Sequence, residues 1–185
     1  MRLCLTIPLA LVTLVAAACL STPTGVADPE KPPFPVGQIG KPVHAKSANG
    51  ATADITLDSA SWFPAGCAGG WSCNVIELTI IGTSPKPFDY NAIDIVAGYG
   101  GGDQPFTHPN DAHWLGADFN VDYTKINKLP PLRQGSVTTG QTAHGFIGYG
   151  LQSQGDVYVK FIDPATDSPN STSPALTVAG WKVHT

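Results

Sequence analysis

Short segments in which apolar and polar residues alternate make up much of the chain. Residues 52–59, for example, place Ala53, Ile55 and Leu57 on one face. The segments with this pattern are residues 52–59, 74–82, 93–99, 119–123, 143–151, 157–162 and 176–183. A period of two is that of a β-strand with one buried face. Beyond the N-terminal stretch, apolar residues do not recur at helical spacing over a useful length, so the pattern predicts an all-β domain.

Turn residues separate these segments. The sequence contains 20 Gly and 17 Pro among 185 residues, whereas charged residues make up only 13%. Seven short strands divided by such residues are typical of an antiparallel β-sandwich. The chain is long enough for one domain that buries its own core, and no second domain is needed.

The N-terminus has the pattern of an export signal. An almost unbroken apolar stretch over residues 3–20 follows Arg2, and a small-residue segment interrupted by Pro23 comes after it. A membrane-spanning helix is the alternative. It is disfavoured because the stretch contains Pro8 and has no Lys or Arg on its far side.

Two cleavage sites compete in this segment. Cleavage after Ala27 follows small residues at the −3 and −1 positions and releases a soluble, secreted protein. Cleavage before Cys19 would leave a lipid-bearing cysteine and anchor the protein to the outer face of the cell membrane. We favour the first site, because Ala16 stands where lipoprotein signals usually carry Leu. The predicted divisions are a signal peptide over 1–27, a Pro-rich leader over 28–38 and a sandwich domain over 39–185.

Charge argues against a nucleic-acid partner. Without Arg2, nine Lys and Arg remain against 14 Asp and Glu, and they form no basic cluster. Phosphate binding depends on concentrated Lys and Arg, so we expect no nucleic-acid binding.

After cleavage at Ala27, Cys67 and Cys73 are the only cysteines left. In an oxidising compartment such a pair is expected to close a disulfide. A ring this short adds about 2 kcal/mol of stability at most. A redox or metal role would need a C-x-x-C spacing or further cysteine ligands, and the sequence has neither.

Four short motifs occur in a characteristic order. They are Gly70-Trp71 before the alternating Val75–Ile80 segment, Phe88-x-Tyr90-x-Ala92, the segment Gly155–Phe161, and the closing Trp181-Lys182-Val183. In this order, over roughly residues 36–184, they resemble the MPT63-like family of small secreted immunogenic mycobacterial proteins. The resemblance implies an immunoglobulin-like β-sandwich of about seven to eight strands without an established enzymatic activity. The chain departs from the family in its cysteine loop and in a longer segment over residues 98–122.

A group of metal-binding residue types lies in that longer segment. His108, Asp111 and His113 offer imidazole and carboxylate ligands, a mixture that Zn²⁺ accepts. The two histidines are five residues apart in a Pro-interrupted stretch, so no helix places them on one face. A solvated loop is the favoured interpretation, and a metal or small-ligand site is the alternative. We expect no cofactor.

No motif predicts catalysis. Ser136 follows Gly135 but lacks the second glycine of a nucleophile elbow. The glycine-rich residues 98–103 have neither a following helix nor a Lys with Ser or Thr, so they are no phosphate cradle. Residues 118–129 begin like a calcium loop, but Tyr123 stands where that loop needs Gly. We therefore expect a protein that is not an enzyme.

Aromatic residues offer a different kind of site. Trp62 and Trp71 flank the cysteine loop, and Trp114 follows His113. Loop-borne tryptophans are typical of protein- or glycan-binding surfaces, although sandwiches also use tryptophan in the core, as we expect for Trp181. The sequence thus predicts an exported protein that binds an extracellular partner, such as a host protein, through its surface.

Overall fold

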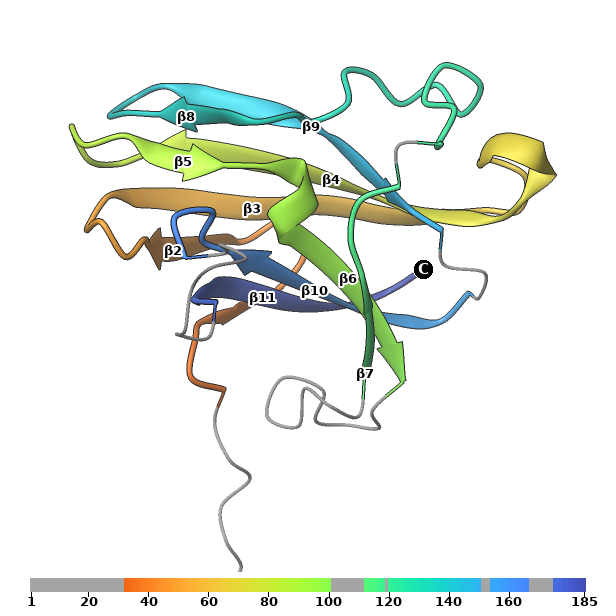
Figure 1. The fold of residues 1–185 in the computed structure, drawn as a ribbon, viewed down its shortest axis with the longest axis horizontal. Helices are drawn as coiled ribbons and strands as arrows, with labels where there is room; N and C mark the ends of the chain where they lie inside the picture. The colour runs from red at the N-terminus through yellow and green to blue at the C-terminus, as the bar shows by residue number, and fades with distance from the viewer. Residues whose placement is uncertain (1–31, 101–111, 119, 151–153, 167–174) are drawn as a thin grey trace, which may run out of the picture.

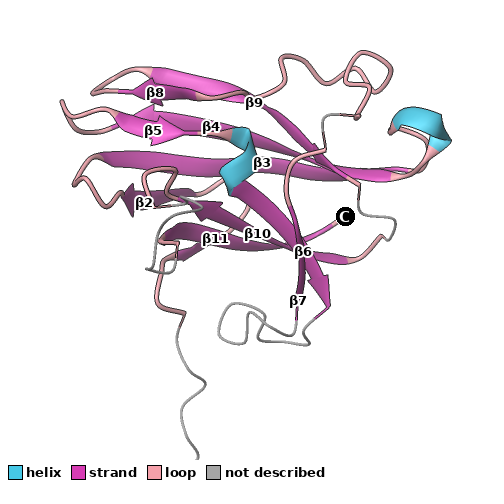
Figure 2. Cartoon of the chain, viewed as in Figure 1, coloured by secondary structure: helices cyan, strands magenta, loops and turns pink. Residues whose placement is uncertain are grey.

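A computed structural model describes residues 32–100, 112–118, 120–150, 154–166 and 175–185 of the chain. These residues form two sheets that lie face to face, with a short two-stranded ribbon beside them (Figure 1). Strands dominate, and the two helical segments are single 3₁₀ turns (Figure 2). The antiparallel β-sandwich predicted from the alternation is therefore confirmed.

The first sheet has five strands in the order β1-β11-β10-β6-β7. They are β1 (Val36–Gly37), β11 (Thr177–His184), β10 (Asp156–Ile162), β6 (Ile95–Gly100) and β7 (Ala112–Leu115). All neighbours are antiparallel except β1 and β11, which run parallel.

The second sheet has four strands in the order β2-β3-β4-β9. They are β2 (Pro42–Lys46), β3 (Thr52–Phe63), β4 (Cys73–Gly82) and β9 (Thr142–Tyr149). The ribbon pairs β5 (Phe88–Tyr90) with β8 (Gly135–Val137), and the 3₁₀ turns are η1 (Ala68–Gly70) and η2 (Ala92–Asp94).

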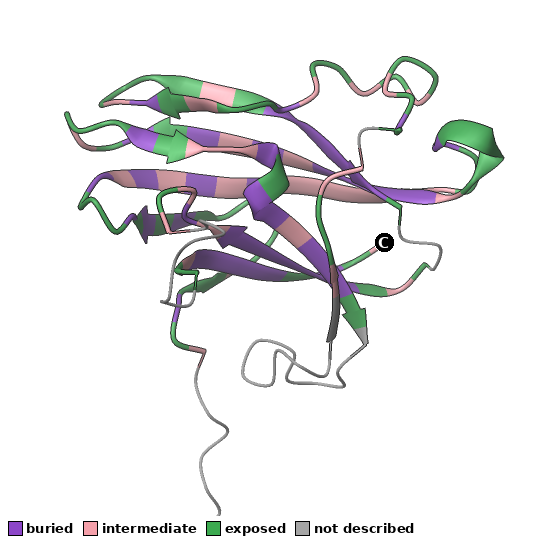
Figure 3. Ribbon diagram, viewed as in Figure 1, coloured by how far each residue is buried: buried purple, intermediate pink, exposed green. Residues whose placement is uncertain are grey.

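The main core lies between the two sheets. The inward residues of β3 are Ala53, Ile55 and Leu57, as predicted, and each is fully buried. Figure 3 shows buried and half-buried positions alternating along β3. Trp181 of β11 is also fully buried, which confirms its predicted place in the core. The burial of apolar side chains between the sheets is the main stabilising contribution to such a fold.

A second, smaller core lies at one end of the second sheet, apart from the main core. Its buried members are Cys67, Cys73, Val75, Val121 and Phe146. Val75 and Cys73 alternate along β4 with Ile76, which belongs to the main core, so they face the other side of the sheet. Tyr123 and Ile126 pack against this second core.

The prediction of a strand over residues 119–123 is wrong for the described part of that segment. Val121 is buried as expected, but it makes only an isolated bridge with Cys67. Acidic side chains explain the turns found there: Asp118 accepts a hydrogen bond from the backbone N–H of Asn120, and Asp122 accepts one from that of Lys125. Such side-chain bonds compete with strand pairing. Phe119 lies outside the described residues.

Part of the Pro-rich leader belongs to the fold. Val36 and Gly37 pair with Gly180 and Trp181 at the edge of the first sheet, and Phe34 is buried. The predicted signal peptide, both cleavage sites and Cys19 lie outside the described residues. Within the described part of the chain, no helix is both long and apolar enough to cross a membrane.

Candidate functional site at the Trp71 loop

The loop between β3 and β4 carries the most exposed tryptophan of the chain. The two strands pair as far as Phe63 and Cys73, and η1 lies in the loop between them. Gly69 and Gly70 have φ angles of 73° and 80°, a left-handed conformation that other residues rarely adopt. A Cβ on Gly69 would lie 3.1 Å from Cδ1 of Trp71, so the indole sits close against this glycine. The two glycines thus fix the backbone of a short loop, and the side chain of Trp71 packs against Gly69.

Hydrogen bonds join this loop to the turns that follow β7. The backbone N–H of Ala68 donates to the carbonyl of Asn120 at 2.9 Å, and that of Asp122 donates to the carbonyl of Gly66 at 3.2 Å. Lys125 Nζ donates to the carbonyl of Ala65 at 2.8 Å. The two segments thus form one surface at one end of the sandwich (Figure 1).

A pocket of about 330 Å³ lies between the two segments. Its lining residues, here called the Trp71 surface, are Cys67, Ala68, Trp71, Ser72, Asp118, Asn120 and Gly150. Trp71 is 62% exposed, and the pocket beside it contains a carboxylate, an amide and a hydroxyl. An exposed indole next to convergent polar groups suits a binding surface, because the ring supplies area and the polar groups orient a partner.

The expected disulfide is absent from the structure. Cys67 and Cys73 are both free, buried thiols, joined by a hydrogen bond between their side chains. Burial raises the pKa of Cys67 and raises that of Cys73 to about 12. Both thiols are therefore protonated at neutral pH, a form that is neither a good nucleophile nor a metal ligand. In this state they act as apolar members of the smaller core.

The three candidate tryptophans do not form one patch. Trp62 lies on β3 opposite Asn74 and is partly buried, with an indole N–H that is enclosed and has no hydrogen-bond partner. Trp114 lies on β7 in the other sheet, where Lys160 Nζ sits 3.8 Å from the centre of its ring. Trp71 alone of the three is an exposed indole. Nothing in the sequence pattern distinguished it, apart from the glycines before it.

The proposed metal ligands fall largely beyond what the structure describes. His108 and Asp111 lie outside the described residues, and only the backbone of His113 is described, in β7. Among the described residues, no group of three or more His, Cys, Asp or Glu side chains could hold a metal ion. The metal site in this segment stays a prediction.

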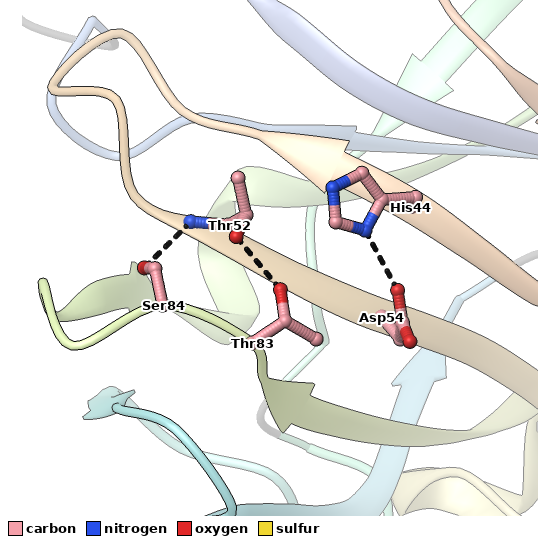
Figure 4. Close-up of polar contacts among 5 residues, drawn as sticks. All are labelled: His44, Thr52, Asp54, Thr83 and Ser84. Carbon is pink, nitrogen blue, oxygen red and sulfur yellow. Dashed lines mark hydrogen bonds and ion pairs between the residues drawn. The ribbon is translucent and has the colours of Figure 1, made fainter.

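The outer face of the second sheet carries polar pairs that the sequence analysis did not single out. His44 pairs with Asp54 at 2.8 Å, and the hydroxyls of Thr52 and Thr83 lie 2.7 Å apart (Figure 4). In the same figure, the backbone N–H of Thr52 donates to the hydroxyl of Ser84. The first pair joins β2 to β3, and the two contacts of Thr52 join β3 to the residues that follow β4, so these contacts fit a role in holding the sheet together.

One group on this face contains Ser, Glu and His. Glu77 accepts from the hydroxyl of Ser59 at 2.8 Å and pairs with His144 Nε2 at 3.0 Å. Burial alone would raise the pKa of Glu77, but these two hydrogen bonds lower it below its ordinary value. The order differs from a catalytic triad, in which His lies between the acid and the nucleophile. Here Ser59 donates to the carboxylate, so His144 cannot activate it.

The fold and the geometry of these surfaces define the class of protein as a two-sheet antiparallel β-sandwich with an exposed loop tryptophan. The chain matches no protein-family model. It also matches no curated protein in sequence.

Solved structures are similar in fold. The candidate lipoprotein ycdA of Bacillus subtilis superposes with a TM-score of 0.51 at 10% identity, over 80% of this chain and 39% of the ycdA chain. MPT63, a secreted protein of Mycobacterium tuberculosis, gives 0.49 at 9% identity, over 82% of this chain and 99% of MPT63. The yjhA protein of B. subtilis gives 0.47 at 14% identity, over 70% and 82%. Such identities concern the fold alone and do not show membership in the MPT63-like family.

Proposed function

We propose that this chain is an exported protein without enzymatic activity, which binds an extracellular partner through the Trp71 surface. The observation that carries the proposal is the 62% exposure of Trp71 beside a polar pocket. Tryptophan is enriched among the residues that dominate binding energy, because a single side chain contributes a large area with little loss of conformational entropy.

The N-terminal pattern supports the place of action. An apolar stretch behind Arg2, followed by a small-residue cleavage site, is typical of an export signal. The motif order that resembles the MPT63-like family agrees with this assignment. Within the proposal the protein is a host-interacting or immunogenic antigen, and its partner is a protein.

The shape of the surface supports a macromolecular partner. The pocket volume of about 330 Å³ is at the lower end of the range for small-molecule sites. Trp71 lines the pocket from an exposed loop, where a partner can cover the indole and seat one side chain in the pocket. Ser72, Asp118 and Asn120 would then supply the polar contacts that orient the partner.

A capture experiment with matched variants tests the proposal. Purified wild type, Trp71→Ala and Ile93→Ala are immobilised and exposed to one mixture of serum and extracellular-matrix proteins. Ile93 is also exposed, at 49%, but lies in η2 and is not one of the residues of the Trp71 surface. We expect at least one protein to be enriched on wild type and Ile93→Ala and lost on Trp71→Ala. Identical captured proteins on all three would argue against the Trp71 surface.

A further inference from the structure

Strand β9 is an edge strand whose outward backbone groups are bonded at one end. The N–H of Phe146 donates to the carbonyl of Pro130 at 3.0 Å, and its C=O accepts from the N–H of Leu132 at 2.8 Å. Two residues on, the C=O of Gly148 accepts from the N–H of Asp118, and its N–H donates to the hydroxyl of Tyr123. These four bonds close the edge of β9 over this part of its length.

The other end of the edge is open. Backbone groups on an antiparallel strand point alternately toward and away from the neighbouring strand. Because Phe146 directs its groups away from β4, His144 and Thr142 do so as well. Within the described residues, neither the N–H nor the C=O of these two residues has a hydrogen-bond partner. The edge therefore presents two donors and two acceptors in the spacing of a strand.

A pocket of about 600 Å³ lies beside this open edge. Both β8 and β9 contribute residues to its lining, and β8 pairs with β5 rather than with β9. Its lining includes Arg133 and Gln134 just before β8, Ser136 in β8, and Thr142 and His144 of β9. A segment of three residues in a strand spans about 10 Å, so a short extended peptide is the ligand whose backbone matches these groups.

The positive charge of Arg133 in the pocket lining favours peptides with an acidic side chain. Arg133 is exposed and forms no ion pair with any described residue. His144 also lines the pocket but is already paired with Glu77 at 3.0 Å, so Arg133 is the cation left for a ligand. No carboxylate belongs to the described lining residues. Arg presents a planar set of donors that fits a carboxylate.

We propose that the open edge of β9 at Thr142 and His144 is a second binding site, which takes an extended peptide carrying an acidic side chain from another protein. The peptide adds a strand to the second sheet and places its carboxylate against Arg133. This site uses other residues than the Trp71 surface and does not depend on it. A two-residue edge is short, as the exposed edges of soluble proteins generally are, so it accepts a ligand without promoting aggregation.

Nuclear magnetic resonance titration with blocked pentapeptides tests this proposal. The probe is TVDVT, and the comparison peptides are TVKVT and a version of TVDVT that is N-methylated at alternate residues. We expect TVDVT, added to a peptide concentration of about 1 mM, to shift the amide signals of Thr142 and His144. The lysine peptide is expected to bind about two- to fivefold more weakly, as for an exposed ion pair, and the methylated peptide not at all.

Variants locate the interaction. Thr142→Pro removes one outward donor without removing a hydrogen bond to β4, and proline is tolerated at such edge positions. We expect Thr142→Pro to abolish the shifts and Arg133→Gln to remove the preference for aspartate. Lys46→Gln is the control, because Lys46 lies on β2 at the opposite edge of the sheet, and we expect it to change nothing. The proposal is overturned if TVDVT produces no shifts at Thr142 and His144, if the methylated peptide binds equally, or if Arg133→Gln keeps the preference.

Discussion

At the scale of single residues, burial decides what each reactive or aromatic side chain can do. Trp181 and Trp71 are the same residue type, yet the first is fully buried in the main core and the second is 62% exposed on a loop. Truncation of the first would create a core cavity, which typically costs about 3–5 kcal/mol. Truncation of the second should leave stability within about 0.5 kcal/mol. The exposed indole is thus the one whose loss can report on binding rather than on folding.

The two thiols give a prediction at the same scale. Burial raises the pKa of Cys73 to about 12, so its thiolate form is scarce at pH 8. We expect iodoacetamide to alkylate Cys67 and Cys73 slowly in the folded protein and rapidly in guanidinium, as followed by intact mass. Rapid alkylation of the folded protein would contradict the burial of these thiols. Failure of both to react in guanidinium without a reductant would show a disulfide instead.

At the scale of elements, alternation predicted the long strands well and the short ones poorly. The segments over residues 52–59 and 157–162 correspond to β3 and β10, because each has enough alternating positions to define a buried face. β1, β5 and β8 have two or three residues each, too few to show a period. Over residues 119–123 the alternation identified a buried residue, Val121, but side-chain hydrogen bonds produced turns in place of a strand.

The candidate site could be predicted only in part, because it joins segments that are distant in the sequence. The sequence drew attention to the cysteine loop and its tryptophans. It could not show that Asp118 and Asn120 lie beside Trp71, because that contact joins segments almost fifty residues apart. The open edge of β9 was equally hidden, since it depends on which backbone groups the Pro130–Leu132 segment reaches.

A glycine in β9 gives a prediction about how the two loops are held together. A Cβ on Gly148 would lie 2.3 Å from Cγ2 of Val121, so Gly148→Ala should push the covering turns away from the sheet. Overpacking of this kind typically costs about 1–3 kcal/mol, measurable by guanidinium unfolding. Gly116→Ala is the matched control, because the nearest atom to its Cβ would be 3.7 Å away. Equal stability of both variants would show that Val121 is not packed against β9.

At the scale of the whole molecule, we propose an exported sandwich that binds a partner through its surface. The position at which the signal peptide is cleaved decides where the protein works, since cleavage before Cys19 would tether it to a membrane. We expect the native mature protein to begin at Asp28 and to carry no lipid, because small residues precede that position. Intact-mass analysis of protein from its native source checks this prediction. A mass that corresponds to a diacylated Cys19 would contradict it.

The central claim is that the Trp71 surface binds the partner, and calorimetry with the captured partner tests it most directly. The partner is titrated into wild type, Trp71→Ala and Ile93→Ala under identical conditions. A central tryptophan typically contributes about 2 kcal/mol or more on truncation, so the account predicts at least about a thirtyfold rise in Kd for Trp71→Ala and no change for Ile93→Ala. A Kd for Trp71→Ala within a factor of about two of wild type, where such a residue should cost far more, would contradict the claim.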